Sequence, residues 1–329
     1  MRQQILGFDS YKGFSIAHEY IKSMLCMKKE LEMEIAVQQR SQEWFDLRKS
    51  VQLTASNFGE ALGVGRGKPY DFFVYFLTEE EEDEVSSSAQ HGINMEVIIS
   101  EMYQLLTSNK IRESGFWIPS KGDILHDLVG VSPDAVVVDK TTKNPIGLCE
   151  FKAPVYSLYN TNTVQGIPRH YMAQMQGQMG VAQLPWCDFM AVCVKAKNLV
   201  LKRVHYSKDY WTNASKMLKE FCLAVKEARS HGGIKDTNLS NDIITQLKQR
   251  DTNFSRLLPG EANIKVDNLL RVNPTQNTFC GPSDVWLTFD CLMGTNIDLP
   301  STTQEYIRNK IELIDKEIQS EQTELWIDV

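Results

Sequence analysis

The strongest constraint on this fold is a short apolar strand that carries two charged residues at alternate positions. Residues 146–151 have the apolar character of a buried strand, and Lys152 follows Glu150 at the second position. Because side chains alternate along a strand, Glu150 and Lys152 project from one face, ~6–7 Å apart, while Cys149 and Phe151 point into the core. Charges on an apolar strand are costly to bury without partners. The chain must therefore supply partners for both groups.

Asp134, in the segment Ser132-Pro133-Asp134, is a candidate partner, and fifteen residues separate it from Glu150. A divalent ion held by Asp134 and Glu150, with the Lys152 ammonium beside it, would satisfy all three groups. Hard oxygen ligands of this kind suit Mg²⁺ or Mn²⁺ rather than zinc. The alternative is a surface salt bridge between Glu150 and Lys152 on an edge strand, and the short pattern alone leaves both open.

The hydrophobic spacing around these residues alternates between helical and strand-like. It predicts helices over residues 14–36, 40–48, 91–106, 168–182 and 209–229, and strands over residues 129–138, 146–151, 188–195 and 199–206. A short helix is expected after residues 54–58, and residues 63–69 are expected to form a connecting loop.

Two of these helices have informative faces. In the helix over 91–106, the expected core face consists of Ile93, Val97, Ile98, Met102 and Leu105.

In the helix over 168–182, Met172, Met175 and Met179 form a stripe that we assign to the core. Tyr171, Gln174 and Gln178 form the adjoining polar face, which either borders a site or faces solvent.

Three further segments occur in order around the Asp134, Glu150 and Lys152 pattern. They are Glu43-Trp44-Phe45-Asp46-Leu47-Arg48 leading to Leu53-Thr54-Ala55-Ser56, His91-Gly92-Ile93-Asn94-Met95-Glu96, and Tyr171-Met172-Ala173-Gln174-Met175-Gln176. The ordered set resembles the lambda-exonuclease, or YqaJ-like viral recombinase, branch of the PD-(D/E)xK nuclease superfamily, over about residues 40–206. The resemblance implies an α/β fold: a restriction-endonuclease-like core with a central mixed β-sheet flanked by helices, here with a helical C-terminal extension.

The resemblance also implies roles for the charged residues. Asp134, Glu150 and the backbone carbonyl of Phe151 would bind Mg²⁺, for which Mn²⁺ would substitute, and Lys152 would position or deprotonate the attacking water. Glu96 and Gln174 would support this site. Taken without the resemblance, Gln174 is equally consistent with a solvated helix face, and a lone Glu96 would usually be a solvated helix glutamate.

A second group of residues matches the family's pocket for a terminal 5′-phosphate. By resemblance this group contains Arg48, Ser56, Ser132 and Tyr171, and an arginine fork with hydroxyls is suitable chemistry for a phosphate dianion. The connection from Arg48 to Ser56 is one residue longer than in the family's best-known member. Arg48 alone would be interpreted as a helix-surface arginine.

The function implied is a Mg²⁺-dependent 5′→3′ exonuclease that converts duplex DNA into 5′-mononucleotides, in recombination or replication-linked end processing. A restriction-like endonuclease using the same site and a non-catalytic DNA-binding recombination module are the alternatives. Double-stranded DNA ends are the expected partner; a single-strand annealing protein and further copies of this chain are candidates.

The expected organisation has three parts: an N-terminal helical segment over residues 1–36, the nuclease over 37–230 and a mostly helical extension over 231–329. The extension ends in a heptad-like stripe that would either pack on the main domain or form an oligomer contact. The stripe consists of Ile307, Ile311, Ile314, Ile318 and Leu325.

The net charge of −7 argues at first sight against a nucleic-acid partner. Residues 79–84 carry six acids and no base, and residues 305–329 carry seven acids against three bases, so the rest of the chain has a net charge of +3. A local basic stripe, namely Lys195, Lys197, Lys202, Arg203 and Lys208, is expected either to follow a DNA backbone or to protect an edge hairpin.

The remaining composition points to an intracellular protein, in the cytoplasm or nucleus and in the host cell if it is viral. No apolar run approaches the ~20 residues needed to cross a bilayer, and the first residues lack the pattern of a signal peptide. Seven cysteines without paired spacing indicate free thiols, and the six histidines show no metal-ligand spacing.

Overall fold

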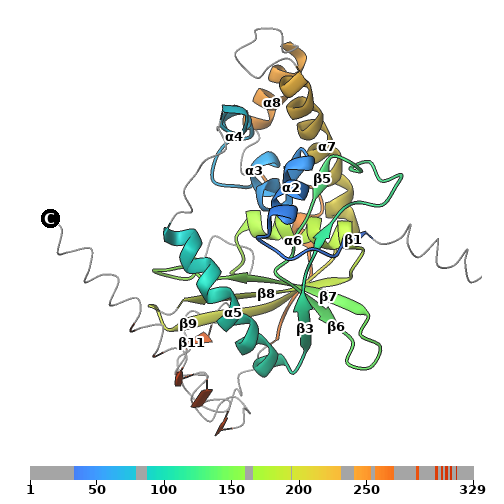
Figure 1. Ribbon diagram of the computed structural model, residues 1–329. Coiled ribbons are helices and arrows are strands. Elements are labelled where there is room, and N and C mark those ends of the chain that lie inside the picture. Colours follow the sequence, from blue (N-terminus) through green and yellow to red (C-terminus); the bar gives the residue numbers. More distant parts are fainter. Residues whose placement is uncertain are drawn as a thin grey trace, which may run out of the picture.

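The computed structural model (Figure 1) describes residues 33–78, 87–159, 166–193, 195–230, 241–252, 256–269 and 287–288, together with residues 301, 302, 305, 306, 308, 309, 312 and 316. The described strands are β1 (Glu34–Ile35), β2 (Leu53–Thr54), β3 (Lys110–Glu113), β4 (Phe116–Trp117), β5 (Val129–Gly130), β6 (Ala135–Val138), β7 (Pro145–Lys152), β8 (Trp186–Cys193), β9 (Asn198–His205), β10 (Val266–Asn268) and β11 (Leu287–Thr288).

The helices named in the described residues are α2 (Gln42–Ser50), α3 (Phe58–Ala61), α4 (Pro69–Thr78), α5 (Ser87–Thr107), α6 (Arg169–Ala182), α7 (Lys208–Ser230) and α8 (Asn241–Thr252). Two 3₁₀ turns, η1 (Ala55–Asn57) and η2 (Glu261–Asn263), complete the set.

Seven of the described strands form a mixed sheet at the centre of the molecule. Its order is β10-β9-β8-β7-β6-β3, and β11 pairs with β9 as well. The β7–β8 pair is parallel and the other pairs are antiparallel. Helix α5 covers one face of the sheet, and α6 with α2, α3 and α7 lies on the other (Figure 1). The predicted mixed α/β architecture, with a central mixed sheet flanked by helices, is confirmed.

The central strands send alternate residues into two cores, as the period of a strand requires. On β7, Leu148 belongs to the core under α6, while Cys149 and Phe151 belong to the core under α5. Met172, Met175 and Met179 of α6 are buried in the first of these cores, as the sequence predicts.

Helix α2 begins where the sequence indicates. The Ser41 side chain accepts a hydrogen bond from the Trp44 N–H (3.3 Å), and Glu43 adds a negative charge in the first turn. The short helix after residues 54–58 is also present as η1 and α3, although neither Thr54 nor Asn57 makes a side-chain cap. Residues 62–68 form the expected loop.

Most predicted elements differ from the observed ones by a few residues at their ends, and two of them differ more. The strand predicted over residues 129–138 is divided into β5 and β6, because Ser132, Pro133 and Asp134 lie between them outside any strand. The helix predicted over residues 14–36 is wrong at its end, where Glu34–Ile35 pairs with β4. Residues 1–32 lie outside the described residues.

The core face predicted for α5 is confirmed at Met102, which is buried, and at Ile98, which packs against the same core, but it is wrong at Val97 and Leu105. Val97 is 64% exposed and Leu105 is 38% exposed, whereas Met95, Ile99, Met102 and Tyr103 are buried. These buried residues also recur at helical spacing, so the apolar pattern of α5 is compatible with either of two helix faces being buried. The sheet selects the face that carries Tyr103, because the Tyr103 hydroxyl meets a buried polar group.

That polar group is Asp188 on β8. The Tyr103 hydroxyl donates to Asp188 Oδ2 (2.6 Å), and Asn109 Nδ2 donates to the Tyr103 oxygen (2.7 Å). Arg203 on β9 donates from Nε and Nη2 to the same carboxylate (2.7 and 2.8 Å), and its guanidinium lies 3.5 Å from the centroid of the Trp186 ring. Burial raises the pKa of Asp188, and these donors oppose that shift.

The basic stripe predicted on β8, β9 and the residues after them is therefore wrong as a continuous surface. Arg203 is bound to Asp188, and Lys202 is buried. The alternative of an edge hairpin is wrong too, since β9 pairs with β8 on one side and with β10 and β11 on the other. Lys195 and Lys208 stay at the surface.

The C-terminal third of the chain contributes to the main body. β10 and β11 extend the central sheet, and α8 packs on α4, where Asp251 accepts from the Tyr70 N–H (3.0 Å). Glu261 is buried against Arg169 at the start of α6. The boundary predicted between residues 230 and 231 remains a prediction.

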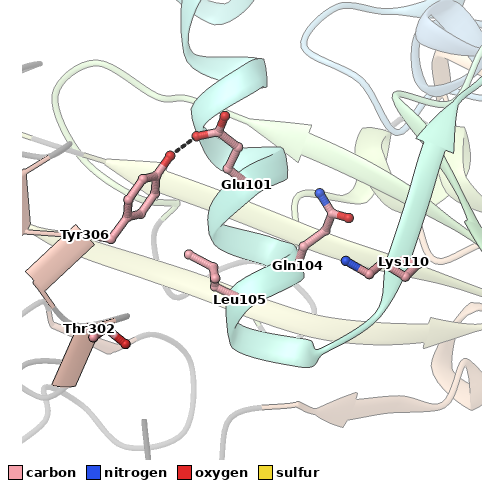
Figure 2. A pocket seen from close by; sticks show the side chains of 6 residues that line it. All are labelled: Glu101, Gln104, Leu105, Lys110, Thr302 and Tyr306. Atoms are coloured by element: carbon pink, nitrogen blue, oxygen red, sulfur yellow. Dashed lines mark hydrogen bonds between the residues drawn. The ribbon is translucent and has the colours of Figure 1, made fainter. Parts of the chain in front are cut away.

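The described residues near the C-terminus contact the outer face of α5. Figure 2 shows the Tyr306 hydroxyl directed at Glu101, to which it donates a hydrogen bond. Thr302, Tyr306, Gln104 and Leu105 border a hollow of 460 Å³ beside this contact.

Several sequence expectations fall outside the described residues: the acidic run at 79–84, the break at 231–233 and the apolar stripe of Ile307, Ile311, Ile314, Ile318 and Leu325. Within the described ranges, Cys149, Cys187, Cys193 and Cys222 are buried free thiols, as predicted. No described helix has the length and apolar character needed to cross a membrane.

The Tyr103 hydroxyl yields a test of the contact between α5 and the sheet. Tyr103→Phe leaves the buried Asp188 oxygen and the partly buried Asn109 amide with one partner fewer, so we expect the free energy of unfolding to fall by about 1–3 kcal/mol. Urea denaturation followed by circular dichroism measures the change. Tyr75→Phe is the matched control, because Tyr75 is 55% exposed, and a loss as large as that of Tyr103→Phe would contradict the interpretation.

Candidate active site

Glu150 lies at the centre of the candidate site. It is fully buried on β7, which is flanked by β6 and β8, so the alternative of an edge-strand salt bridge is wrong. Gln174 Nε2 donates to Glu150 Oε1 (2.7 Å) and Gln178 Nε2 donates to Oε2 (2.7 Å). The polar face predicted on α6 thus points at Glu150.

Lys152 projects from the same face of β7 as Glu150. Its ammonium contacts Glu150 Oε1 and lies 5.0 Å from the centroid of the Tyr171 ring, and its side chain is 22% exposed. Burial lowers the pKa of Lys152, but the carboxylates of Glu150 and Asp134 outweigh burial and raise it above its usual value. Lys152 is therefore a cation held among acidic groups.

Asp134 stands directly before β6, beside Glu150. Asp134 Oδ2 accepts from the Phe151 N–H (2.5 Å), and the Asp134 N–H donates to the Cys149 carbonyl (3.1 Å). Burial raises the pKa of Asp134 well above its usual value, and the charges of Glu150 and Glu96 raise it further. Lys152 and the Phe151 N–H act in the opposite direction. Like charges gathered in a buried site call for a cation.

Glu96 lies on α5, which covers the opposite face of the sheet from α6. Its carboxylate forms an ion pair with Arg40, and the Glu96 side chain is 22% exposed. The charge of Glu96 is one of those that raise the pKa of Asp134.

The donor set can be compared with what a metal ion requires. Among the described residues, no three His, Cys, Asp or Glu side chains converge closely enough to hold an ion by themselves. Mg²⁺ commonly uses only one or two carboxylates and keeps several waters. The adjacent Asp134 and Glu150 carboxylates therefore fit Mg²⁺ better than they fit a site closed by protein ligands alone.

A second polar cluster surrounds Trp44 on α2. Arg48 Nη2 donates to Thr54 Oγ1 (3.2 Å), and the Arg48 guanidinium lies 4.5 Å from the centroid of the Trp44 ring. Thr54 Oγ1 also shares a hydrogen bond with Ser56 Oγ (3.2 Å). Trp44 Nε1 donates to Ser132 Oγ (3.0 Å). These contacts bring Arg48, Ser56 and Ser132 into one group.

Ser132 links the two clusters, because only Pro133 separates it from Asp134. Burial lowers the pKa of Arg48, yet a guanidinium stays charged at any physiological pH. The structure thus presents a partly buried arginine with three hydroxyls next to an acidic site.

Tyr171 lies on the Lys152 side of the site. Its ring packs against Tyr159 (5.6 Å between centroids) and Phe189 (6.0 Å). Tyr171 is thus part of an aromatic wall behind the Lys152 ammonium.

These residues fall within one recognisable domain. Residues 43–185 match the YqaJ-like viral recombinase domain. The chain contains a YqaJ-like viral recombinase domain. Asp134, Glu150, Lys152, Arg48 and the polar face of α6 all lie inside it.

Solved structures were compared with the whole chain. The crystal structure of an alkaline exonuclease (LHK-Exo) from Laribacter hongkongensis is 21% identical, with a TM-score of 0.45, and the match covers 65% of this chain and 100% of that one. The crystal structure of LHK-Exo in complex with dAMP is 20% identical, with a TM-score of 0.46 and the same coverage. The comparison with curated proteins gave no match.

The YqaJ-like domain holds site residues that the sequence analysis missed. Thr54 accepts from Arg48, and Trp44 donates to Ser132. In the sequence, both residues are noted only as members of the segment over 43–56. Burial lowers the pKa of His170 to about 4, and the charges of Arg66, in the loop assigned as a connector, and of Lys152 act in the same direction. No periodic pattern marks a loop residue such as Arg66.

Gln178 provides a stability test of this site. Gln178→Leu removes the donor to Glu150 Oε2 inside the protein, and we expect the free energy of unfolding to fall by about 1–3 kcal/mol because the acceptor is buried and charged. Chemical denaturation measures the loss. Gln42→Leu is the control, since Gln42 makes an exposed hydrogen bond to Asp46 and should cost less than about 0.5 kcal/mol. Equal losses would contradict the role assigned to Gln178.

Proposed function

We propose that this chain is a metal-dependent exonuclease that digests duplex DNA in the 5′→3′ direction and releases 5′-mononucleotides. The observation that carries the proposal is the clustering of Asp134, Glu150 and Lys152 inside a YqaJ-like domain. We assign the nuclease to residues 37–230, and its role to end processing in recombination or replication.

We assign Asp134, Glu150 and the Phe151 carbonyl to the metal. The Phe151 N–H is directed at Asp134, and the N–H and C=O of one strand residue point toward the same neighbouring strand. The carbonyl is therefore on the Asp134 side of β7. When bound, Mg²⁺ polarises the scissile phosphate and lowers the pKa of a coordinated water, and Mn²⁺ takes the same oxygen ligands.

The other residues of the site act on charge and orientation. Lys152, in contact with Glu150, orients the attacking water and offsets the negative charge that develops on the phosphate. Gln174 and Gln178 each hold one oxygen of Glu150 and so fix the plane of its carboxylate. Glu96 completes the acidic wall on the α5 side.

We assign the Trp44 cluster to the 5′ end of the DNA. The Arg48 guanidinium and the hydroxyls of Ser56 and Ser132 are donors suited to a phosphate dianion, and Tyr171 lines the path to Lys152. A pocket that binds a terminal phosphate beside the cleavage site would make the enzyme start at ends. A single-strand annealing protein and further copies of this chain are the partners we propose besides DNA.

Lys152→Ala tests the catalytic assignment. We expect this variant to lose DNA cleavage in Mg²⁺ and to keep duplex binding in Ca²⁺, because the substitution removes the ammonium beside the phosphate and leaves both carboxylates. A linear duplex labelled separately at its 5′ and 3′ ends gives both the rate and the direction of digestion.

The same assay decides between the alternative functions. A covalently closed circular duplex resists an enzyme that needs an end, so cleavage of the circle would favour the restriction-like endonuclease. Binding by the wild-type chain without Mg²⁺-dependent digestion would favour the non-catalytic module. Undiminished turnover by Lys152→Ala would overturn the assignment of the site.

Arg48→Ala tests the phosphate pocket. We expect a loss of about tenfold or more in kcat/KM on 5′-phosphorylated ends, since a charged hydrogen bond contributes about 1.5–3 kcal/mol. Activity on 5′-hydroxyl ends should change little. Lys49→Ala, on the next position of α2 and at its exposed side, is the control. Equal losses by Arg48→Ala on both kinds of end would contradict the pocket.

A further inference from the structure

The turn between β1 and α2 contains an arginine in an unusual backbone conformation. Arg40 has φ 65°, in the left-handed region that favours glycine. Residues other than glycine persist in this region when the surrounding structure holds them there, and such positions are concentrated at functional sites. The contacts of the turn show what holds Arg40.

Both neighbours of Arg40 are tied to the candidate site. Gln39 Nε2 donates to the carbonyl of Pro133 (2.8 Å), the residue before Asp134, and to the carbonyl of Ser114 (3.1 Å). Ser41 on the other side caps the helix that carries Arg48. The turn therefore joins the segment before Asp134 to the start of α2.

The Arg40 side chain reaches a third part of the site. Its Nη2 donates to Glu96 Oε2 on α5, a residue 56 positions away in the chain. Gln39, the neighbour of Arg40, is bonded to the Pro133 carbonyl directly before Asp134, so the ion pair between Arg40 and Glu96 lies on the Asp134 side of the site. Arg40 is 43% exposed, and Glu96 is 22% exposed.

We propose that Arg40 is a positioning residue that holds the Glu96 carboxylate beside Asp134 in the orientation needed for metal binding and cleavage. This inference deepens the proposed nuclease function and rests on it. Arg40 lies before residues 43–185, outside the part of the chain that matches the YqaJ-like domain.

Stability does not account for this arginine. Partly exposed ion pairs contribute little to folding because water and salt screen them, and a left-handed arginine costs conformational free energy that a glycine would not. The small gain in folding free energy from the ion pair is therefore opposed by the cost of the left-handed backbone conformation. A side chain that orients Glu96 accounts for the contact.

Arg40→Gly separates these explanations, because glycine removes the guanidinium and also relieves the backbone. We expect thermal stability to stay equal or rise, while Mn²⁺ binding, measured by electron paramagnetic resonance, weakens by about tenfold, as for other residues that orient a metal ligand. The kcat on a 5′-phosphorylated linear duplex should fall by a similar factor, with KM for DNA nearly unchanged.

Lys143→Gly is the matched control. Lys143 has φ 62°, lies in the exposed turn between β6 and β7, and bonds only within that turn in the described contacts. Its replacement relieves the same kind of backbone conformation away from the acidic cluster. Thermal stability should again stay equal or rise, but Mn²⁺ affinity and kcat should match those of the wild-type chain.

A double-mutant cycle tests whether Arg40 acts through Glu96. If it does, Arg40→Gly in a Glu96→Gln background causes no further loss of Mn²⁺ affinity or kcat. Additive losses, tighter Mn²⁺ binding by Arg40→Gly, or unchanged Mn²⁺ binding would each overturn the inference. Tighter binding would mean that Arg40 only neutralises charge at the site.

The Mn²⁺ measurements keep this inference separate from the proposed function. A wild-type chain that binds Mn²⁺ but digests no DNA would contradict the nuclease, while the cycle measured on Mn²⁺ binding alone would still support or overturn the role of Arg40.

Discussion

The hydrogen bonds to the Glu150 carboxylate fix the relation between sheet and helix on which the site depends. A fully buried carboxylate would strongly disfavour folding unless donors replaced its lost water. Gln174 and Gln178 supply one donor to each oxygen, and the Lys152 ammonium adds charge to the first. Two of these donors come from α6, so a shift of α6 by one residue would remove both glutamine hydrogen bonds and leave one oxygen of the buried carboxylate without a donor. Stability and site geometry therefore share one set of contacts.

The parts of the site that could be predicted from the sequence follow local periodicity. The period of two placed Glu150 and Lys152 on one face of a strand, and the period of 3.6 placed Gln174 and Gln178 on one face of a helix. Neither rule says which element lies opposite. The resemblance to a nuclease family suggested that the polar face of α6 borders Glu150. In the structure, Gln174 and Gln178 do contact it.

The predictions that were wrong depended on contacts between distant residues. Arg203 looked like part of a surface stripe because no acid lies near it in the stretch after Asp188, yet strand pairing places it across from Asp188 itself. Part of the buried face of α5 was misassigned for the same reason, since the hydrogen bond from Tyr103 to Asp188 joins α5 to β8. Thr54 and Arg40 were missed because a hydrogen bond from another element, not a pattern, makes each of them part of the site.

The pairing of β10 with β9 has a consequence for synthesis of the chain. Val266 to Asn268 are opposite Lys202 to Val204, so about sixty residues must follow β9 before its open side is covered. Glu261 must also arrive before Arg169, at the start of α6, has its partner. A chain emerging from the ribosome therefore carries an exposed strand edge, and such edges promote association between nascent chains. The last third of the protein ends that exposure.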